Sequence, residues 1–411
     1  MKKQQILGSL MASGAVLSGL VAGLTTPLAP TQPDLIPVAV NAPAPSAQPA
    51  PANYVHAPEI SAKAGLVLEA NSGKVLFEHH ADDRLPIASM TKVATLGVIY
   101  QALADGTLTM DTPVLVSERA ASMGGSQAFL DAGSTYSVRD LIQSIVVASA
   151  NDSCVALAEQ VAGSVESFVE RMNTFARDCG CQNTNFVNCT GLPTPGAYSC
   201  ARDMARMYQR IMQSPHYGDF NHVWMYDLTH PSGRITGLTN TNKLIRNYDG
   251  CLGGKTGFTS EAGHCLTVAA ARDDLRPIAV VIGAPDSKTR FAESRELLDY
   301  AFQGFVNQRV VDHTVPVQNV TLTNAVLNEI PVFPAQDFYY LTAKGTVADL
   351  AVASEIPGKV AAPLQTDTTL GKIMVLENGK VLEEIPVVPG AAVPAANYWE
   401  NLRKITQGAK L

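Results

Sequence analysis

The sequence PIASMTKVATLGVIY, residues 86–100, decides the fold of this 411-residue chain. The run 93–100 is apolar on nearly every side, which is typical of a helix buried in a core rather than laid on a surface. If Ser89 opens this helix, Lys92 follows one turn later and faces the same side. We therefore predict a buried helix whose first turn presents a serine hydroxyl and a lysine amine.

The Ser89 and Lys92 pair suits nucleophilic catalysis. A serine hydroxyl is a poor nucleophile until a base removes its proton. A lysine can be that base if its pKa, ordinarily about 10.4, is lowered by burial or by a second cation. The backbone N–H groups at a helix start also suit a developing oxyanion. Alone, the pattern fits an N-cap serine beside a solvated lysine equally well.

The segments on both sides of this helix predict one sheet built from two distant parts of the chain. Strands are expected at 64–70 and 75–78 around a turn, and again at 266–271 and 277–282. Helical spacing of apolar residues predicts helices between and after them, at 138–147, 152–161, 166–176, 204–212 and 290–305. This order indicates an α+β fold, in which a helical cluster packs on an antiparallel sheet.

We place this predicted catalytic domain at 55–308, and the residues before it form two segments. Residues 1–26 begin with Lys2 and Lys3 and continue as an uncharged apolar run, which predicts a secretory signal peptide or an uncleaved anchor. Residues 27–54 are dominated by Pro and Ala, so they predict an extended tether.

A second domain is predicted after the catalytic one. Residues 310–390 are rich in Val, Thr and Ile, and Asn378-Gly379 is a strong hairpin signal, so we expect a small all-β domain. The tail 393–411 predicts either an amphipathic helix at a membrane surface or a plain capping helix.

Composition excludes some functions. The net charge of −7 argues against a nucleic-acid binder, which would carry a basic face. Seven cysteines are present, an odd number, so at least one thiol is free or pairs with another chain. In an exported chain we expect disulfides or buried thiols. No Cys and His spacing suggests zinc, and neither a metal nor another cofactor is predicted.

Two further short patterns offer chemistry that complements Ser89. Ser149-Ala150-Asn151 supplies a hydroxyl for proton transfer and an amide for holding a substrate amide. Lys255-Thr256-Gly257 supplies a cation, a hydroxyl and a glycine that lets a ligand approach a strand. Alone, the first fits helix capping and the second fits an exposed edge strand. They follow Ser89 at separations of 60 and then 106 residues, each where an element boundary could face one cleft.

Together the three patterns resemble those of the penicillin-recognising serine acyltransferases, which include penicillin-binding proteins and serine β-lactamases. The likeness extends to other short stretches, namely Gly191-Leu192-Pro193, Asp203-Met204-Ala205, Phe258-Thr259, Ala284-Pro285 and Glu293-Ser294. It covers about 58–306 and, more loosely, the β-domain to about 390. Within this group the chain is similar to the low-molecular-mass D-Ala-D-Ala carboxypeptidases of the penicillin-binding protein 5 type, peptidase family S11.

The resemblance implies a set of catalytic residues. Ser89 would attack the penultimate D-Ala carbonyl, Lys92 would be the general base, and Ser149 would relay a proton to the departing D-Ala. The backbone N–H groups of Ser89 and Phe258 would form the oxyanion hole. Members of the family often have His where Phe258 stands, and this difference bears on deacylation.

The resemblance also implies a set of substrate-binding residues. Asn151 would orient the substrate, and Lys255 would supply positive potential. Thr256 and Arg290 would hold the terminal carboxylate, and Gly257 would let the substrate approach the strand.

The implied activity is removal of the terminal D-Ala from peptidoglycan stem pentapeptides, with covalent inhibition by β-lactam antibiotics. The expected location is the periplasm, either free or at the inner-membrane surface. A D,D-endopeptidase would use the same residues. A β-lactamase would need a fast deacylation base, and the nearest pair, Glu170 and Asn173, lies on a predicted helix. A non-catalytic wall-binding module would have lost one of the six reactive side chains, yet all retain usable chemistry.

Overall fold

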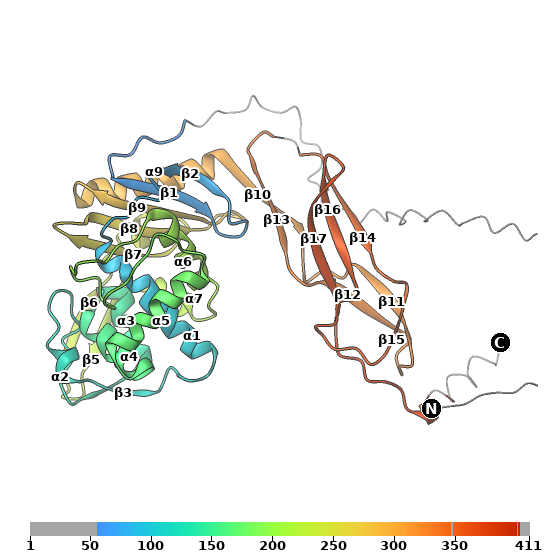
Figure 1. The fold of residues 1–411 in the computed structure, drawn as a ribbon, viewed down its shortest axis with the longest axis horizontal. Helices are drawn as coiled ribbons and strands as arrows, with labels where there is room; N and C mark the ends of the chain where they lie inside the picture. The colour runs from blue at the N-terminus through green and yellow to red at the C-terminus, as the bar shows by residue number, and fades with distance from the viewer. Residues whose placement is uncertain (1–55, 347, 401, 403–411) are drawn as a thin grey trace, which may run out of the picture.

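The computed structural model describes residues 56–346, 348–400 and 402 (Figure 1). The segments predicted at 1–26 and 27–54 lie outside these residues, as does most of the predicted tail helix at 393–411. In the described part of the chain, no helix combines the length and apolarity needed to cross a membrane.

The catalytic domain is organised around a five-stranded antiparallel sheet with the order β2-β1-β9-β8-β7. Its strands are β1 (Ala64–Glu69), β2 (Val75–His79), β7 (Cys251–Thr259), β8 (Gly263–Ala270) and β9 (Pro277–Ala284). Pairing of β1 with β9 joins the two ends of the domain, so the predicted assembly of one sheet from distant segments is confirmed. Strand β7 lies at one edge of the sheet, opposite β2, and it carries the Lys-Thr-Gly triplet.

Helices cover both faces of this sheet (Figure 1). The larger cluster comprises α1 (Lys92–Ala104), α2 (Glu118–Ala121), α3 (Val138–Ala148), α4 (Asn151–Ala162), α5 (Val165–Asp178), α6 (Ala201–Met212) and α7 (Tyr217–Asn221). The opposite face is covered by α9 (Ser287–Gly304). Alternation along β1 explains the two layers, because Leu66 packs in the helical cluster whereas Val67 packs with α9.

The predicted buried helix is present as α1, and every residue from Lys92 to Tyr100 is buried. A short 3-10 helix, η1 (Ala88–Thr91), precedes it, so the reactive serine lies in η1 and the lysine opens α1. The remaining short elements of this domain are β3 (Pro113–Leu115), β4 (Thr135–Ser137), β5 (Met225–Thr229), β6 (Ile235–Thr239) and α8 (Leu244–Asn247).

The second domain is all-β, as predicted. Its strands are β10 (Phe305–Val311), β11 (Gln318–Thr323), β12 (Glu329–Pro334), β13 (Phe338–Ala343), β14 (Leu350–Glu355), β15 (Lys359–Ala361), β16 (Gly371–Glu377) and β17 (Lys380–Pro389). They form a six-stranded sheet, β14-β16-β17-β12-β11-β15, and the pair β10-β13. The predicted hairpin joins β16 to β17, and both Asn378 and Gly379 have the positive φ that such two-residue turns require.

Candidate active site

The reactive serine lies in a backbone segment held between two other chain segments. Ser89 is half-buried in η1, and Ala88 before it has φ +47, a conformation that L-residues rarely adopt. Gly191 lies against Ala88 so closely that a Cβ there would be 2.0 Å from the Ala88 carbonyl oxygen. On the other side, a Cβ on Gly257 of β7 would be 2.5 Å from the Ile87 oxygen. Strained backbone held by its surroundings is frequent at catalytic positions.

Lys92 has three oxygen partners. Its Nζ donates to Ser89 Oγ at 3.0 Å, to Asn151 Oδ1 at 2.7 Å and to the Thr190 carbonyl oxygen at 2.6 Å. A charged ammonium has three N–H groups, whereas the neutral amine has two. Because the Asn151 and Thr190 oxygens can only accept, a neutral amine donates to both and directs its lone pair at Ser89.

The site favours this neutral amine. Lys92 is completely buried, and burial lowers its pKa from the ordinary lysine value. Burial also lowers the pKa of Lys255 well below its ordinary value, and the nearby Lys92 charge lowers it further. Of the two expected causes, burial and a second cation, burial is the one that lowers the Lys92 pKa.

Ser149 connects the two lysine regions. It follows α3 in a left-handed conformation, with φ +62, and the next helix, α4, begins at Asn151. Lys255 Nζ donates to Ser149 Oγ at 2.8 Å, so the second and third sequence patterns meet directly. Both side chains are buried.

Both the oxygen and the nitrogen of the Asn151 side-chain amide have hydrogen-bond partners in the structure. Its Oδ1 accepts from Lys92, and its Nδ2 donates to the Gly124 carbonyl oxygen at 2.7 Å. Its backbone N–H donates to the Ser126 oxygen at 2.7 Å. The next residue, Asp152, accepts from the N–H groups of Ala128 and Leu130, which fixes the same loop. The sequence assigned Asn151 to substrate binding, and the structure adds a second task, the orientation of the Lys92 amine.

The residues predicted on β7 lie along one edge. Thr256 is buried and its Oγ1 donates to Thr241 Oγ1 at 2.7 Å. Phe258 is 57% exposed, and its ring stacks on His264 with ring centroids 4.3 Å apart. The approach of Gly257 to the backbone of η1 makes the two predicted oxyanion-hole residues, Ser89 and Phe258, neighbours across a short gap.

Arg290 lies apart from the serine-lysine network, at the start of α9. Its Nη1 donates to the carbonyl oxygens of Gly257 and Cys265, both at 3.4 Å, and its Nη2 donates to Ser287 Oγ at 3.2 Å. Its Nε is buried without a partner among the described residues. Arg290 therefore reaches the site through the backbone of Gly257, and its guanidinium retains donor capacity for an anion.

Two contributors to the site have no signal in the three patterns. The Thr190 carbonyl oxygen orients Lys92, and the Thr241 hydroxyl receives the bond from Thr256. Any residue can supply a carbonyl, so Thr190 is not visible in a residue pattern. The available signal was its turn, in which Asn188 Oδ1 accepts from the N–H groups of Thr190 and Gly191.

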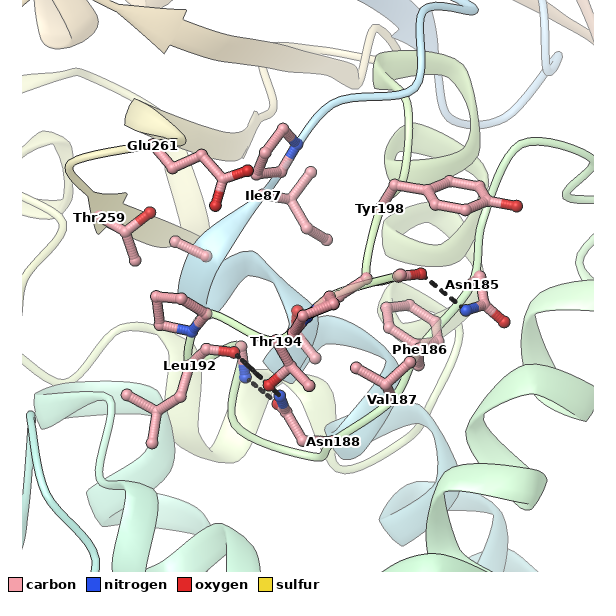
Figure 2. A pocket seen from close by; sticks show the side chains of 18 residues that line it. Ile87, Asn185, Phe186, Val187, Asn188, Leu192, Thr194, Tyr198, Thr259 and Glu261 are labelled. Atoms are coloured by element: carbon pink, nitrogen blue, oxygen red, sulfur yellow. Dashed lines mark hydrogen bonds between the residues drawn. The ribbon is translucent and has the colours of Figure 1, made fainter.

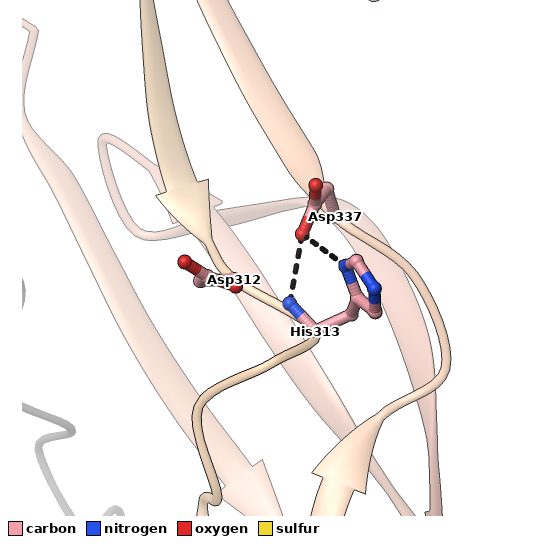
Figure 3. A group of neighbouring side chains, drawn as sticks. All are labelled: Asp312, His313 and Asp337. Carbon is pink, nitrogen blue, oxygen red and sulfur yellow. Dashed lines mark hydrogen bonds and ion pairs between the residues drawn. The ribbon is translucent and has the colours of Figure 1, made fainter.

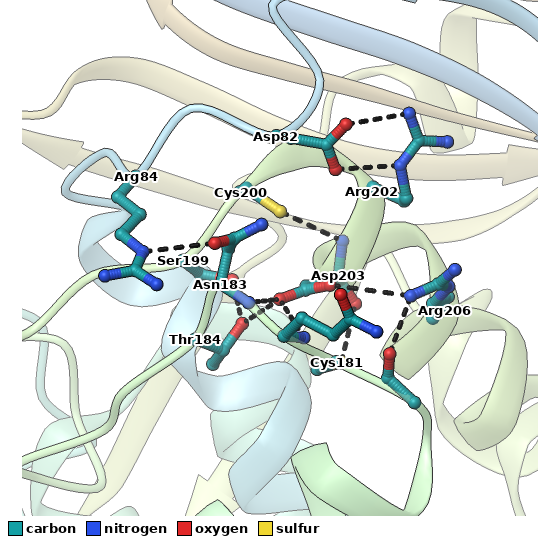
Figure 4. Close-up of polar contacts among 12 residues, drawn as sticks. Asp82, Arg84, Cys181, Asn183, Thr184, Ser199, Cys200, Arg202, Asp203 and Arg206 are labelled. Carbon is teal, nitrogen blue, oxygen red and sulfur yellow. Dashed lines mark hydrogen bonds and ion pairs between the residues drawn. The ribbon is translucent and has the colours of Figure 1, made fainter.

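The Asp203-Met204-Ala205 stretch fixes the loop that carries Thr190. The buried Asp203 carboxylate accepts from the N–H groups of Gln182 and Asn183 at 3.1 and 2.7 Å and from Thr184 Oγ1 at 2.8 Å (Figure 4). These bonds attach the start of the loop to the first turn of α6. Asp203 is thus a positioning residue, since it holds the segment that reaches the reactive centre.

All seven cysteines are unpaired, and the thiols are only partly buried as a set. Four of them are buried and three are partly exposed, namely Cys179, Cys181 and Cys251. Cys154, beneath Lys92, is completely buried, and burial raises its pKa to about 11. Cys200 is the N-cap residue of α6, and its Sγ accepts from the Asp203 N–H at 3.4 Å (Figure 4). These thiols are protonated at neutral pH and act in packing and capping.

One group of metal-ligand type occurs in the described residues, and it lies in the β-domain. His313 Nδ1 is 2.8 Å from Asp337 Oδ1, with Asp312 beside them (Figure 3). Arg309 Nη1 is 3.0 Å from the Asp312 carboxylate, so the group already contains a cation. We therefore assign it no metal.

Comparison with known proteins agrees with this site. The profile of D-alanyl-D-alanine carboxypeptidase matches residues 51–286, and that of the penicillin-binding protein 5 C-terminal domain matches residues 305–395. The D-alanyl-D-alanine carboxypeptidase DacF of Bacillus subtilis is 36% identical over 84% of this chain and 88% of its own length. DacC of Escherichia coli is 33% identical over 81% of this chain and 84% of its own.

Solved structures give the same result. Penicillin-binding protein 5 of Haemophilus influenzae is 30% identical, with a TM-score of 0.66 over 83% of this chain and 99% of that chain. A variant of the Streptomyces K15 DD-transpeptidase is 29% identical, with a TM-score of 0.57 over 60% of this chain and 99% of that chain. The expected α+β fold is confirmed. The chain belongs to the D-alanyl-D-alanine carboxypeptidase family of serine peptidases and carries the C-terminal domain of penicillin-binding protein 5.

Proposed function

We propose that the enzyme removes the terminal D-Ala of peptidoglycan stem pentapeptides through an acyl-enzyme on Ser89. The observation that carries this proposal is the environment of the Lys92 amine, whose two fixed acceptors direct its lone pair at Ser89 Oγ, 3.0 Å away. Lys92 removes the hydroxyl proton while Oγ bonds to the penultimate D-Ala carbonyl carbon. The oxyanion forms against the N–H groups of Ser89 and Phe258.

Collapse of this intermediate breaks the bond to the terminal D-Ala. The leaving amine needs a proton, and the one that Lys92 took from Ser89 passes to it through the Ser149 hydroxyl, which Lys255 Nζ holds at 2.8 Å. Lys92 is then neutral again. Lys255, Thr256 and Arg290 lie toward the terminal carboxylate and hold it. Water then attacks the acyl-enzyme, with Lys92 again as the base, and releases the shortened peptide and Ser89.

The same chemistry opens a β-lactam ring and leaves an acyl group on Ser89, so we propose covalent inhibition by β-lactams. Glu170 and Asn173 lie on α5, and the Asn173 amide is engaged with the Val169 and Phe186 backbone. This arrangement supports slow deacylation rather than β-lactamase activity. Export to the periplasm and a role in cell-wall remodelling remain part of the proposal and rest on the sequence of residues 1–26.

A fluorescent penicillin tests the nucleophile. We expect one covalent label, mapped to the peptide that contains Ser89, and no label on a Ser89→Ala variant that retains its folded circular dichroism spectrum. A label elsewhere in the wild-type protein would refute the assignment.

Parallel incubations with a stem pentapeptide, a cross-linked dimer and nitrocefin test the reaction. Release of D-Ala from the pentapeptide with negligible nitrocefin turnover is the expected outcome. Faster cleavage of the dimer would make the enzyme an endopeptidase, and rapid nitrocefin turnover would make it a β-lactamase.

A further inference from the structure

A pocket of about 400 Å³ lies beside the reactive serine and has no role in the mechanism above. One wall is the loop 185–198, and the opposite wall is the end of β7 with Thr259 and Glu261 (Figure 2). Its inner end is formed by Ile87 and Ala88, which directly precede Ser89. The pocket therefore shares both η1 and β7 with the catalytic site.

The direction of β7 places this pocket on the acyl side of the scissile bond. Lys255 and Thr256 are at the end of the site that receives the terminal carboxylate, and Phe258 supplies an oxyanion-hole N–H. Thr259 and Glu261 come later along the same chain. An extended peptide advances about 3.3 Å per residue. The residue that precedes D-Ala-D-Ala then lies near Thr259, and a long side chain on it reaches Glu261.

The lining of the pocket combines an apolar body with one negative charge. Its apolar part includes Ile87, Phe186, Val187 and Leu192. Of the described residues that line it, Glu261 is the only charged one. Glu261 is exposed, and within the described part of the chain its carboxylate has no hydrogen bond or ion pair. Such a surface fits an aliphatic side chain that ends in an ammonium group.

We propose that this pocket binds the amine-bearing side chain of the residue preceding D-Ala-D-Ala, with its ammonium paired to Glu261. Glu261 is thus a specificity-determining residue for a diamino acid at that position. This inference rests on the proposed function, because it takes the direction of the stem peptide from the carboxypeptidase mechanism.

The test uses two stem pentapeptides that differ only at this residue, one with lysine and one with norleucine. The full-length enzyme should show a kcat/KM about fivefold higher for the lysine peptide, the upper range for a solvent-accessible ion pair. Glu261→Gln should abolish the preference, and Glu261→Lys should reverse it. Glu296→Gln is the matched control, because Glu296 is exposed on α9 and that change removes the same charge elsewhere.

Three measurements distinguish a failure of the subsite proposal from a failure of the carboxypeptidase proposal. Equal kcat/KM values for the two peptides in the wild-type enzyme, or an unchanged preference in Glu261→Lys, would overturn the subsite and leave the carboxypeptidase proposal intact. Absence of D-Ala release from both peptides would overturn the carboxypeptidase proposal. Calorimetric binding of both peptides to Ser89→Ala then decides the subsite without turnover, since tighter binding of the lysine peptide supports it and equal binding refutes it.

Discussion

The lysines of the two domains differ in their burial and in their partners. In the catalytic domain, Lys92 and Lys255 are buried, and their partners are the oxygens of neighbouring side chains and backbone. In the β-domain, Lys372 pairs with Glu384 at 2.7 Å on the surface, with the two side chains 36% and 52% exposed. Burying an amine without a carboxylate partner costs stability unless it becomes neutral. Burial in the catalytic domain therefore favours the neutral form of Lys92, which its proposed role as a base requires.

Two glycines with similar backbone conformations also differ in their surroundings between the two domains. Gly191 and Gly379 both have positive φ, +80 and +76. Around Gly379, in the β-domain hairpin, a Cβ would meet nothing within 4 Å. Around Gly191 a Cβ would be 2.0 Å from the Ala88 oxygen. Gly379 is needed only for the backbone conformation of a turn. Gly191 is needed both for its backbone conformation and for its close contact with Ala88.

The largest effect should come from fixing a positive charge at Lys92. Lys92→Arg replaces the amine by a guanidinium that stays protonated, so we expect acylation by benzylpenicillin to fall about 10³-fold. In the wild-type enzyme the acylation rate should rise as the pH rises through the lowered pKa of Lys92, and level off below the ordinary lysine pKa of about 10.4. Stopped-flow acylation as a function of pH measures both. Lys372→Arg is the control, and its pH profile should match that of the wild type.

A smaller effect is expected from adding a side-chain atom where Gly191 contacts Ala88. Gly191→Ala must displace Ala88 or the loop, which shifts Ser89, and a displacement of about 1 Å at a catalytic group costs about 10²-fold in rate. Gly379→Ala introduces the same strained φ in open space, so kcat/KM should remain that of the wild type. Equal losses in both variants would show that conformational strain, and not the contact with Ala88, explains the result.

This contrast also shows what the sequence could predict. The order and apolar spacing of the segments predicted the fold, and the three patterns containing Ser89, Ser149 and Lys255 predicted the side chains that meet in the structure. The orientation of the Lys92 amine was not predictable, because it depends on the Thr190 carbonyl, a group that every residue possesses. The bonds of Asn151 to Lys92 and to the Gly124 oxygen were not predicted for a related reason, since spacing identifies an amide but not its partners.

Truncation of a core side chain in either domain should give a third effect, of intermediate size. Ile142 of α3 and Ile385 of β17 are both fully buried, and truncation of such a residue to alanine costs about 2–5 kcal/mol. We expect both Ile142→Ala and Ile385→Ala to lower the melting temperature. Only Ile142→Ala should also slow acylation, because Ser149 directly follows α3 as its C-cap residue. Calorimetry combined with penicillin acylation below the melting transition checks this, and a slowed Ile385→Ala would show that the β-domain supports the active site.

The smallest effect is expected for the charged pair on the β-domain. Lys372 also lies 3.7 Å from Glu355, yet all three side chains are at least one-third exposed, so water and salt screen their attraction. A double-mutant cycle of Lys372→Ala and Glu384→Ala, followed by urea unfolding, should give a coupling energy below about 1 kcal/mol. The coupling should decrease further at high salt, because exposed charges separated by solvent are screened. A larger coupling energy that does not change with salt would mean that Lys372 and Glu384 are effectively buried. The lysines of the two domains would then differ in the identity of their partners and not in their exposure to water.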